Sequence, residues 1–152
     1  MSTAPVQGVI VGGIHRLPIR VYFEDTDAGG IVYHARYLAY FERARSEFLR
    51  CLGIDHAAAL QQSPESRLGF AVRHCQIDYL APAVLDDALR IESQLARVGA
   101  AYTDVRQRVL RGDMVLVQAS LRIAMVDGRG RPARLPRPWR EAMVPLVGKE
   151  EW

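Results

Sequence analysis

The sequence predicts an α+β domain in which an antiparallel sheet of about five strands wraps around one long helix. One strand-like segment precedes a single amphipathic helix, about four strand-like segments follow it, and no second long helical pattern occurs. One helix cannot cover both faces of such a sheet. The sheet therefore has to curl around the helix, or a second copy of the chain has to cover the remaining surface.

The first strand and the helix are predicted by two different periods. Apolar residues occupy every second position over residues 17–23, as expected for a strand with one buried face. The spacing then changes to steps of four and three from Tyr37 to Cys51, which predicts a helix from about Ala35 to Leu52. Gly53 is a natural C-terminal stop for that helix.

The second half of the chain contains repeated strand signals. Four further strands are expected over Gly69–Tyr79, Leu89–Leu95, Tyr102–Leu110 and Met114–Asp127. Residues 111–113 form a hairpin turn between the last two. The last strand is almost continuously apolar, which favours a central place in the sheet.

Length and composition indicate one globular domain. The chain has 152 residues, of which 49% are hydrophobic, enough for a substantial core. We expect a loose extension over residues 1–13, the folded domain over residues 14–140 and a tail over residues 141–152. The net charge of +3 is too mild for a strong nucleic-acid binder, so no nucleic-acid partner is expected.

The cysteines and the N-terminus favour a cytoplasmic protein without a transmembrane segment. Cys51 and Cys75 lie in apolar patterns without metal-ligand spacing, so we expect buried thiols in a reducing compartment. Residues 6–14 are apolar, but no positive residue precedes them and the run is too short to span a bilayer.

Residues 24–34, EDTDAGGIVYH, contain three acids, two glycines and a histidine, and the acids are not needed for packing a core. The spacing of Asp25, Asp27 and Gly30 superficially matches a calcium loop, but the twelfth position, where a bidentate glutamate belongs, is Arg36. With no second histidine at helical spacing, we expect no metal site. Asp25 is expected to cap the turn and the helix entrance.

The same run can form an oxyanion site beside a carboxylate. Gly29 and Gly30 allow a ligand to approach the backbone closely, and the helix start presents unpaired N–H groups near His34. This combination suits acyl transfer, with Asp27 as the acid-base group or nucleophile. No G-x-S-x-G motif supplies a serine nucleophile.

An arginine-rich stretch over residues 128–140 contains three prolines and no acid. Such a tract can contact phosphate groups, but it holds one aromatic residue and no recognisable nucleic-acid motif. We expect a solvated tail or an edge of a phosphate-bearing site.

Two blocks of the sequence resemble a known family. The first is VYFEDTDAGGIVYHARY at residues 21–37, which runs into FERAR at residues 41–45; the second is FAVR at residues 70–73, followed by IDYLAPA at residues 77–83. Over residues 15–138 the chain resembles the hotdog-fold acyl-CoA thioesterases. It is most similar to their 4-hydroxybenzoyl-CoA thioesterase-like branch, which includes the YbgC proteins associated with the Tol-Pal system.

This resemblance implies the hotdog fold, active sites at a dimer interface, and a homodimer or homotetramer. By similarity, Asp27 matches the catalytic acid of the family. His34 matches a histidine at the helix entrance whose backbone N–H binds the thioester carbonyl. Phe23 departs from the tyrosine usual in that branch, which leaves the substrate preference open.

We therefore expect hydrolysis of acyl-CoA or acyl-carrier-protein thioesters. Asp27 would be the nucleophile or general base, and His34 would polarise the carbonyl or orient Asp27 and water. The remaining expected substrate contacts are Gly29, Gly30, Tyr33 and Arg73. Coenzyme A is part of the substrate and no separate cofactor is expected. The alternative is a non-catalytic acyl-binding protein or a partner of a cell-envelope complex with the same fold.

Overall fold

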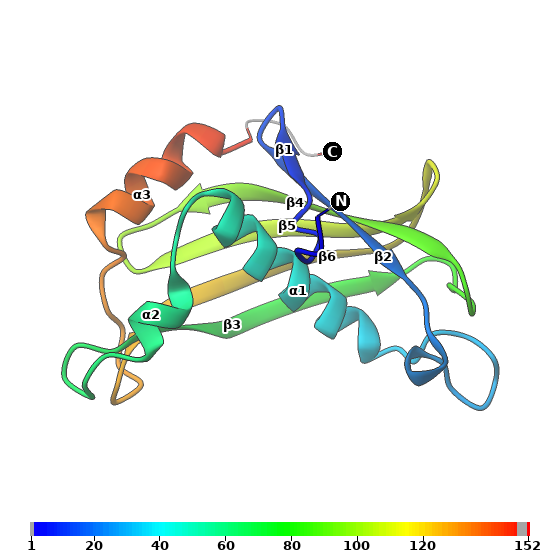
Figure 1. Ribbon diagram of the computed structural model, residues 1–152, viewed down its shortest axis with the longest axis horizontal. Helices are drawn as coiled ribbons and strands as arrows, with labels where there is room; N and C mark the ends of the chain where they lie inside the picture. Colours follow the sequence, from blue (N-terminus) through cyan, green and yellow to red (C-terminus); the bar gives the residue numbers. More distant parts are fainter. Residues whose placement is uncertain (1, 149–151) are drawn as a thin grey trace.

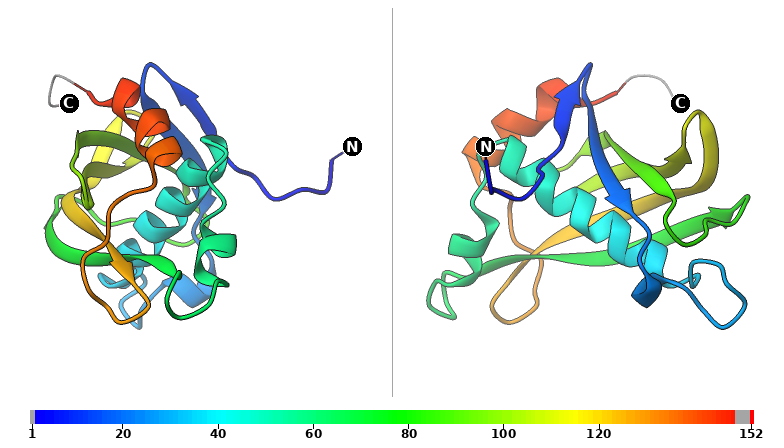
Figure 2. Two further views of the ribbon diagram at one scale, coloured as in Figure 1. Left: turned by 90° about the vertical axis from the view of Figure 1, so that its left-hand side faces the viewer. Right: turned by 45° about the vertical axis from the view of Figure 1, so that its right-hand side comes forward.

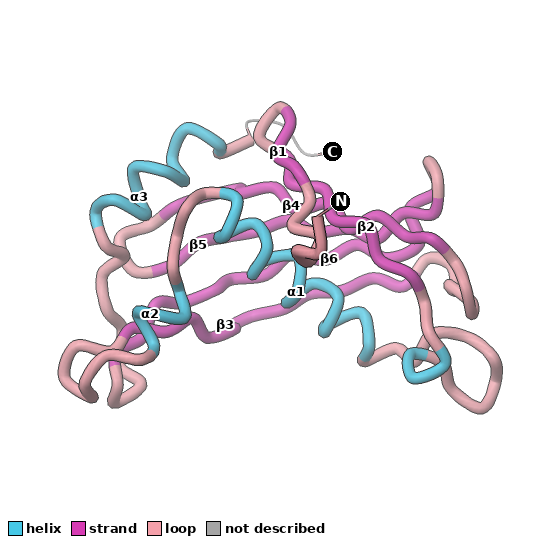
Figure 3. Tube along the Cα trace, viewed as in Figure 1, coloured by secondary structure: helices cyan, strands magenta, loops and turns pink. Residues whose placement is uncertain are grey.

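The computed structural model describes residues 2–148 and 152, which form a six-stranded sheet with three α-helices (Figures 1 and 3). The strands are β1 (Val9–Val11), β2 (Ile14–Arg20), β3 (Leu68–Tyr79), β4 (Ala88–Val98), β5 (Tyr102–Arg111) and β6 (Met114–Asp127). The helices are α1 (Arg36–Cys51), α2 (His56–Leu60) and α3 (Arg137–Met143), with 3-10 turns η1 (Phe23–Asp25) and η2 (Val144–Leu146).

The sheet is antiparallel throughout, in the order β1-β2-β4-β5-β6-β3. It curls around α1, which lies across its concave face (Figure 2). The predicted fold class is thus confirmed, with one strand more than expected. The central place expected for the last strand is also confirmed, because β6 lies between β5 and β3.

The predicted helix is one residue shorter at each end than expected. Its buried face follows the predicted stripe, with Tyr40 as an addition: Tyr37, Tyr40, Phe41, Ala44 and Phe48. Cys51 is only partly buried. None of the helices in the described residues is long and apolar enough to cross a membrane.

The first predicted strand ends early. The chain leaves the sheet after Arg20, so Phe23 lies in η1 and is 82% exposed. The expectation that Phe23 shares the buried face of the strand is wrong. Period-two alternation continued by chance into a segment that turns toward α1.

The N-terminal segment, expected to be a loose extension over residues 1–13, contains the additional strand β1. Gly12 and Gly13 both have positive φ, +60° and +79°, as a tight turn between β1 and β2 requires. The ring of His15 is fully buried, stacks on Phe48 and contacts the carbonyl of Gln7 at 2.8 Å. The segment is therefore held to the core from residue 7.

The C-terminal side shows no break at residue 140, where the folded domain was expected to end. Helix α3 continues through Met143, which is 2% exposed, and Trp139 stacks on Phe70 of β3. Part of the stretch expected to be a solvated tail therefore packs on the core. Of the expected tail, residues 149–151 lie outside the described residues.

The expectation of two buried thiols is wrong for Cys75. Both cysteines are free, and Cys75 is exposed on β3. The reason is that β3 is an edge strand with most of its side chains exposed.

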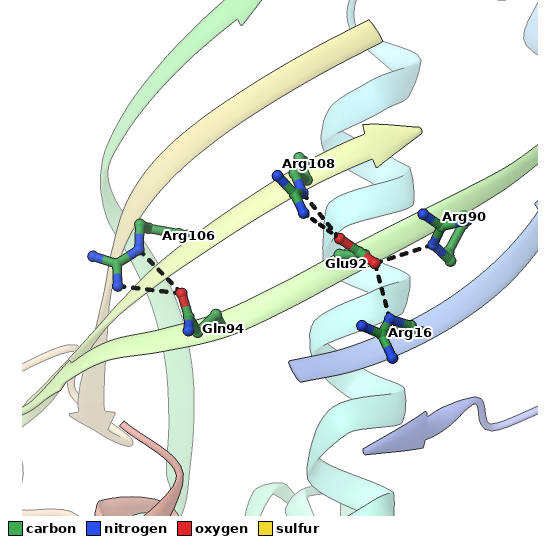
Figure 4. A network of polar contacts seen from close by, with 6 residues as sticks. All are labelled: Arg16, Arg90, Glu92, Gln94, Arg106 and Arg108. Atoms are coloured by element: carbon green, nitrogen blue, oxygen red, sulfur yellow. Dashed lines mark hydrogen bonds and ion pairs between the residues drawn. The ribbon is translucent and has the colours of Figure 1, made fainter. Parts of the chain in front are cut away.

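The convex face of the sheet is organised around one buried carboxylate. The Glu92 side chain is 3% exposed and accepts from the guanidinium groups of Arg16, Arg90 and Arg108 at 2.8–3.0 Å (Figure 4). Burial alone would raise the pKa of Glu92, but the three guanidinium groups outweigh it and lower the pKa below that of an ordinary glutamate. The cluster ties β2, β4 and β5 together.

We predict that Glu92→Gln lowers the free energy of unfolding at neutral pH by on the order of 1–3 kcal/mol, because three guanidinium groups lose the buried negative charge and one of its two acceptor oxygens. A lowered folded pKa means that the stabilisation is complete above the unfolded pKa of about 4.3 and is lost as pH falls through the folded value. Urea unfolding at pH 7 and at lower pH measures both.

Glu141→Gln is the matched control, since its pair with Arg137 is exposed and we expect a change within about 0.5 kcal/mol. Equal effects of the two substitutions would contradict the assignment.

Candidate active site

The acidic loop between η1 and α1 folds as a short hairpin that positions Asp27. The N–H of Asp27 donates to the Ile31 carbonyl at 2.8 Å, and the N–H of Gly30 donates to the Asp27 carbonyl at 3.0 Å. One carboxylate oxygen, Oδ1, accepts from the N–H of Gly29 at 2.8 Å. The other, Oδ2, makes no hydrogen bond or ion pair to any residue that the structure describes. Asp27 is therefore oriented by the loop and keeps one oxygen available.

Both glycines are needed by this geometry. Gly30 has φ of +84°, a conformation that side chains rarely adopt. A Cβ at Gly29 would lie 3.2 Å from Oδ1 of Asp27, so a side chain there would disturb the hydrogen bond that orients the carboxylate.

Asp25 anchors the loop from the inside. It is 5% exposed, its Oδ2 accepts from the N–H of Tyr22 at 2.8 Å, and its Oδ1 pairs with Arg36 Nε at 3.0 Å. Burial, together with the nearby Asp25 carboxylate, raises the pKa of the Tyr40 hydroxyl. These contacts fit the structural role that was expected for Asp25.

His34 lies two residues before the first residue of α1. Its side chain is exposed, and the ring of Tyr33, 50% exposed, lies 4.5 Å away. Within residues 2–148, the backbone N–H of His34 donates to no acceptor, and no hydrogen bond joins the His34 ring to Asp27. The geometry thus offers the backbone N–H of His34, at the positive end of a helix dipole, as an anion donor.

Tyr79 is a neighbour of the site that the sequence did not single out. Its hydroxyl donates to the His34 carbonyl at 2.8 Å, and burial raises its pKa, which keeps the hydroxyl protonated as a donor. Tyr79 ends β3, so it fixes the helix entrance against that strand. The sequence offered one sign of this role, since Tyr79 is the last residue of the predicted strand Gly69–Tyr79.

Arg73 is not brought to this site within one chain. It occupies a bulge in β3 and lines a depression of about 570 Å³ with Arg106 and Arg122. It lies six positions from Tyr79 along the strand, about 20 Å at strand spacing. Over the described residues, no three His, Cys, Asp or Glu side chains gather closely enough to hold a metal ion.

Comparison with known proteins supports the resemblance seen in the sequence. Residues 21–143 match the model of the Thioesterase-like superfamily. The chain belongs to this superfamily. A probable thioesterase from Bartonella henselae superposes with a TM-score of 0.77 at 41% identity, covering 81% of this chain and 99% of that one.

Two curated relatives of this thioesterase-family chain carry specific names. The acyl-CoA thioesterase YbgC of Haemophilus influenzae is 44% identical over 126 residues, 82% of this chain and 90% of the relative. The acyl-CoA thioester hydrolase YbgC of Escherichia coli O6:H1 is 39% identical over 126 residues, 82% and 91% of the two chains. The expected family and the expected hotdog fold are confirmed.

The geometry predicts that Asp25→Ala destabilises the fold. The substitution removes the buried carboxylate that accepts from the N–H of Tyr22 and pairs with Arg36, so we expect a loss of about 1–3 kcal/mol in the free energy of unfolding. Urea denaturation followed by circular dichroism measures it. Asp113→Ala, in the exposed turn between β5 and β6, serves as control, and equal losses would show that Asp25 is no anchor.

Proposed function

We propose that the chain hydrolyses acyl-CoA thioesters to a free acid and coenzyme A. The observation that carries the proposal is the Asp27 carboxylate, held by Gly29 with one oxygen unpartnered, in the loop that ends at the unpaired N–H of His34. The two YbgC relatives are named for this reaction. The two unpaired thiols and a coenzyme A substrate fit the cytoplasm as the proposed location.

The chemistry follows from these two groups. The thioester oxygen accepts from the His34 N–H, which stabilises the negative charge that develops on it. Asp27 then either takes a proton from an attacking water or attacks the carbonyl carbon and forms an anhydride, which water opens. In both routes the carbon–sulfur bond breaks and the electron pair leaves on the thiolate. A thiol pKa of about 8.5 makes that departure easy without a strong acid.

A dimer through β3 completes the proposed site. This 12-residue strand is an edge of the sheet and is mostly exposed, and an edge of this length pairs readily with another strand. A two-fold axis pairs two such edges antiparallel. The Tyr79 end of one strand then lies beside the Leu68 end of the other, so the His34 end of one copy faces the start of β3 in the second.

The other expected contacts have distinct proposed places. Gly29 and Gly30 leave room for the pantetheine arm beside Asp27, and the exposed Tyr33 ring offers it an apolar surface. Arg73 is too far along β3 to touch the thioester of its own copy. With Arg106 and Arg122 around the same depression, it is proposed to contact coenzyme A phosphates, which lie at the far end of the substrate.

Asp27→Asn is expected to lower kcat/KM by at least about a hundredfold, the scale of a lost general base or nucleophile. Thiol release from a panel of acyl-CoAs, with an acyl-carrier-protein of matched chain length, measures it. Asp113→Asn is the control. An unimpaired Asp27→Asn variant, or a wild type that releases no thiol from any substrate, would refute the proposed function.

A pair of substitutions separates the N–H of His34 from its ring. His34→Ala keeps the backbone donor, so we expect kcat to fall less than about tenfold. His34→Pro removes the donor at a position that no helical hydrogen bond requires, and kcat should fall about 100- to 1000-fold, as for a lost oxyanion donor. Circular dichroism checks that both variants fold. Equal losses of activity in the two variants would contradict a role of the N–H and show that the ring is the important group.

A further inference from the structure

The entrance of α1 presents two adjacent backbone donors, the N–H groups of His34 and Ala35. These residues are the central pair of a turn that the N–H of Arg36 closes by donating to the Tyr33 carbonyl at 2.8 Å. Ala35 has helical φ and ψ, −74° and −17°. Within residues 2–148, neither the His34 N–H nor the Ala35 N–H donates to any acceptor. Both therefore point out of the helix start, as the first N–H groups of a helix do.

The peptide between these two residues is held at its carbonyl end by Tyr79. The His34 carbonyl and the Ala35 N–H belong to one planar unit, so the direction of one sets the direction of the other. The Leu38 N–H, which would bond the His34 carbonyl in a regular helix, donates to the Ala35 carbonyl at 3.2 Å. Among the described residues, the Tyr79 hydroxyl at 2.8 Å is the one donor to the His34 carbonyl.

The Tyr79 hydroxyl is itself fixed by the sheet and by two aromatic rings. The next residue, Leu80, is tied to β6 because its N–H donates to the Leu116 carbonyl at 2.8 Å. The ring of Tyr79 packs against those of Tyr37 and His34, with ring centroids 5.7 Å and 6.3 Å away. The sheet thus carries a preorganised donor to a peptide of the loop.

We propose that Tyr79 is a positioning residue of the oxyanion site, whose hydroxyl fixes the peptide between His34 and Ala35 so that the Ala35 N–H is a second donor to the thioester oxygen. The inference rests on the proposed function and deepens it. Donors that are fixed before the reaction stabilise the developing charge without reorganisation. Without the hydroxyl, the peptide is free to rotate and to turn the Ala35 N–H away from that oxygen.

Tyr79→Phe removes the hydroxyl and keeps the ring. For the acyl-CoA that the wild type hydrolyses fastest, we expect kcat to fall about 10- to 100-fold, the scale of a misplaced reacting group. KM should change less than about threefold, because the lost interaction is made mainly in the transition state. Replacing Tyr79 by 4-aminophenylalanine keeps a donor at the same ring position and should restore kcat to within about threefold.

Tyr37→Phe is the matched control. It removes a neighbouring hydroxyl that accepts from the Ala83 N–H at 3.2 Å and does not touch the peptide between His34 and Ala35. We expect it to lower the thermal stability and to keep kcat within about twofold of the wild type. Thermal unfolding of every variant shows whether a lost activity is a lost fold.

The carbonyl stretch of a bound analogue measures the donors without turnover. The probe is the ketone analogue of the same acyl-CoA, with a methylene group in place of the thioester sulfur and a carbon-13 label at the carbonyl. Binding to the wild type should move its infrared band to lower wavenumber, since hydrogen bonds weaken the carbonyl bond. Tyr79→Phe should reverse part of that shift, whereas Tyr37→Phe should leave it unchanged.

The outcomes separate this inference from the proposed function. The inference is wrong, and the proposed function stands, if the wild type hydrolyses acyl-CoAs while Tyr79→Phe keeps the wild-type kcat or the wild-type carbonyl band. Equal losses of kcat in Tyr79→Phe and Tyr37→Phe would also overturn it, because general support of the helix entrance would then explain both. If the wild type hydrolyses no acyl-CoA, the proposed function fails and the inference falls with it.

Discussion

In the described part of the chain, one helix of 16 residues has to cover the concave face of a six-stranded sheet, and it cannot cover all of it. Helix α1 lies against β2 and β4, while β3 at the far edge is contacted mainly by β6 and the short helix α2. The uncovered wedge between α1 and β3 becomes a cavity, and β3 keeps an unpaired edge. The proposed interface follows from this unpaired edge.

The position of α1 on the sheet is fixed by polar contacts as well as by apolar packing. Gln107 of β5 is fully buried, and its amide nitrogen donates to the Phe41 carbonyl at 3.0 Å and contacts Ser93 Oγ at 2.9 Å. Its amide oxygen accepts from Arg45 at 3.0 Å. Buried polar groups of this kind are costly unless they are satisfied, so they favour one placement of the helix over its neighbours. Asp25 does the same at the helix entrance through its contacts with Tyr22 and Arg36.

Local patterns were sufficient for the elements that depend on one period. The α1 stripe and the longer strands follow from alternation and spacing, and the Asp27–Gly30 run follows from turn chemistry. Strand β1 was missed because three residues in a glycine-rich segment carry no detectable alternation. Helix α3 was missed because Pro136 and Pro138 indicate a loop, although a proline is tolerated in the first helical turn.

The parts of the structure that sequence reasoning missed depend on tertiary contacts between distant segments. Tyr79 reaches His34 across 45 residues, and Trp139 meets Phe70 across 69. The same limitation explains Arg73, because a strand places residues six positions apart about 20 Å from one another. The sequence indicated that Arg73 could bind a phosphate group, but it did not indicate how far Arg73 lies from the loop.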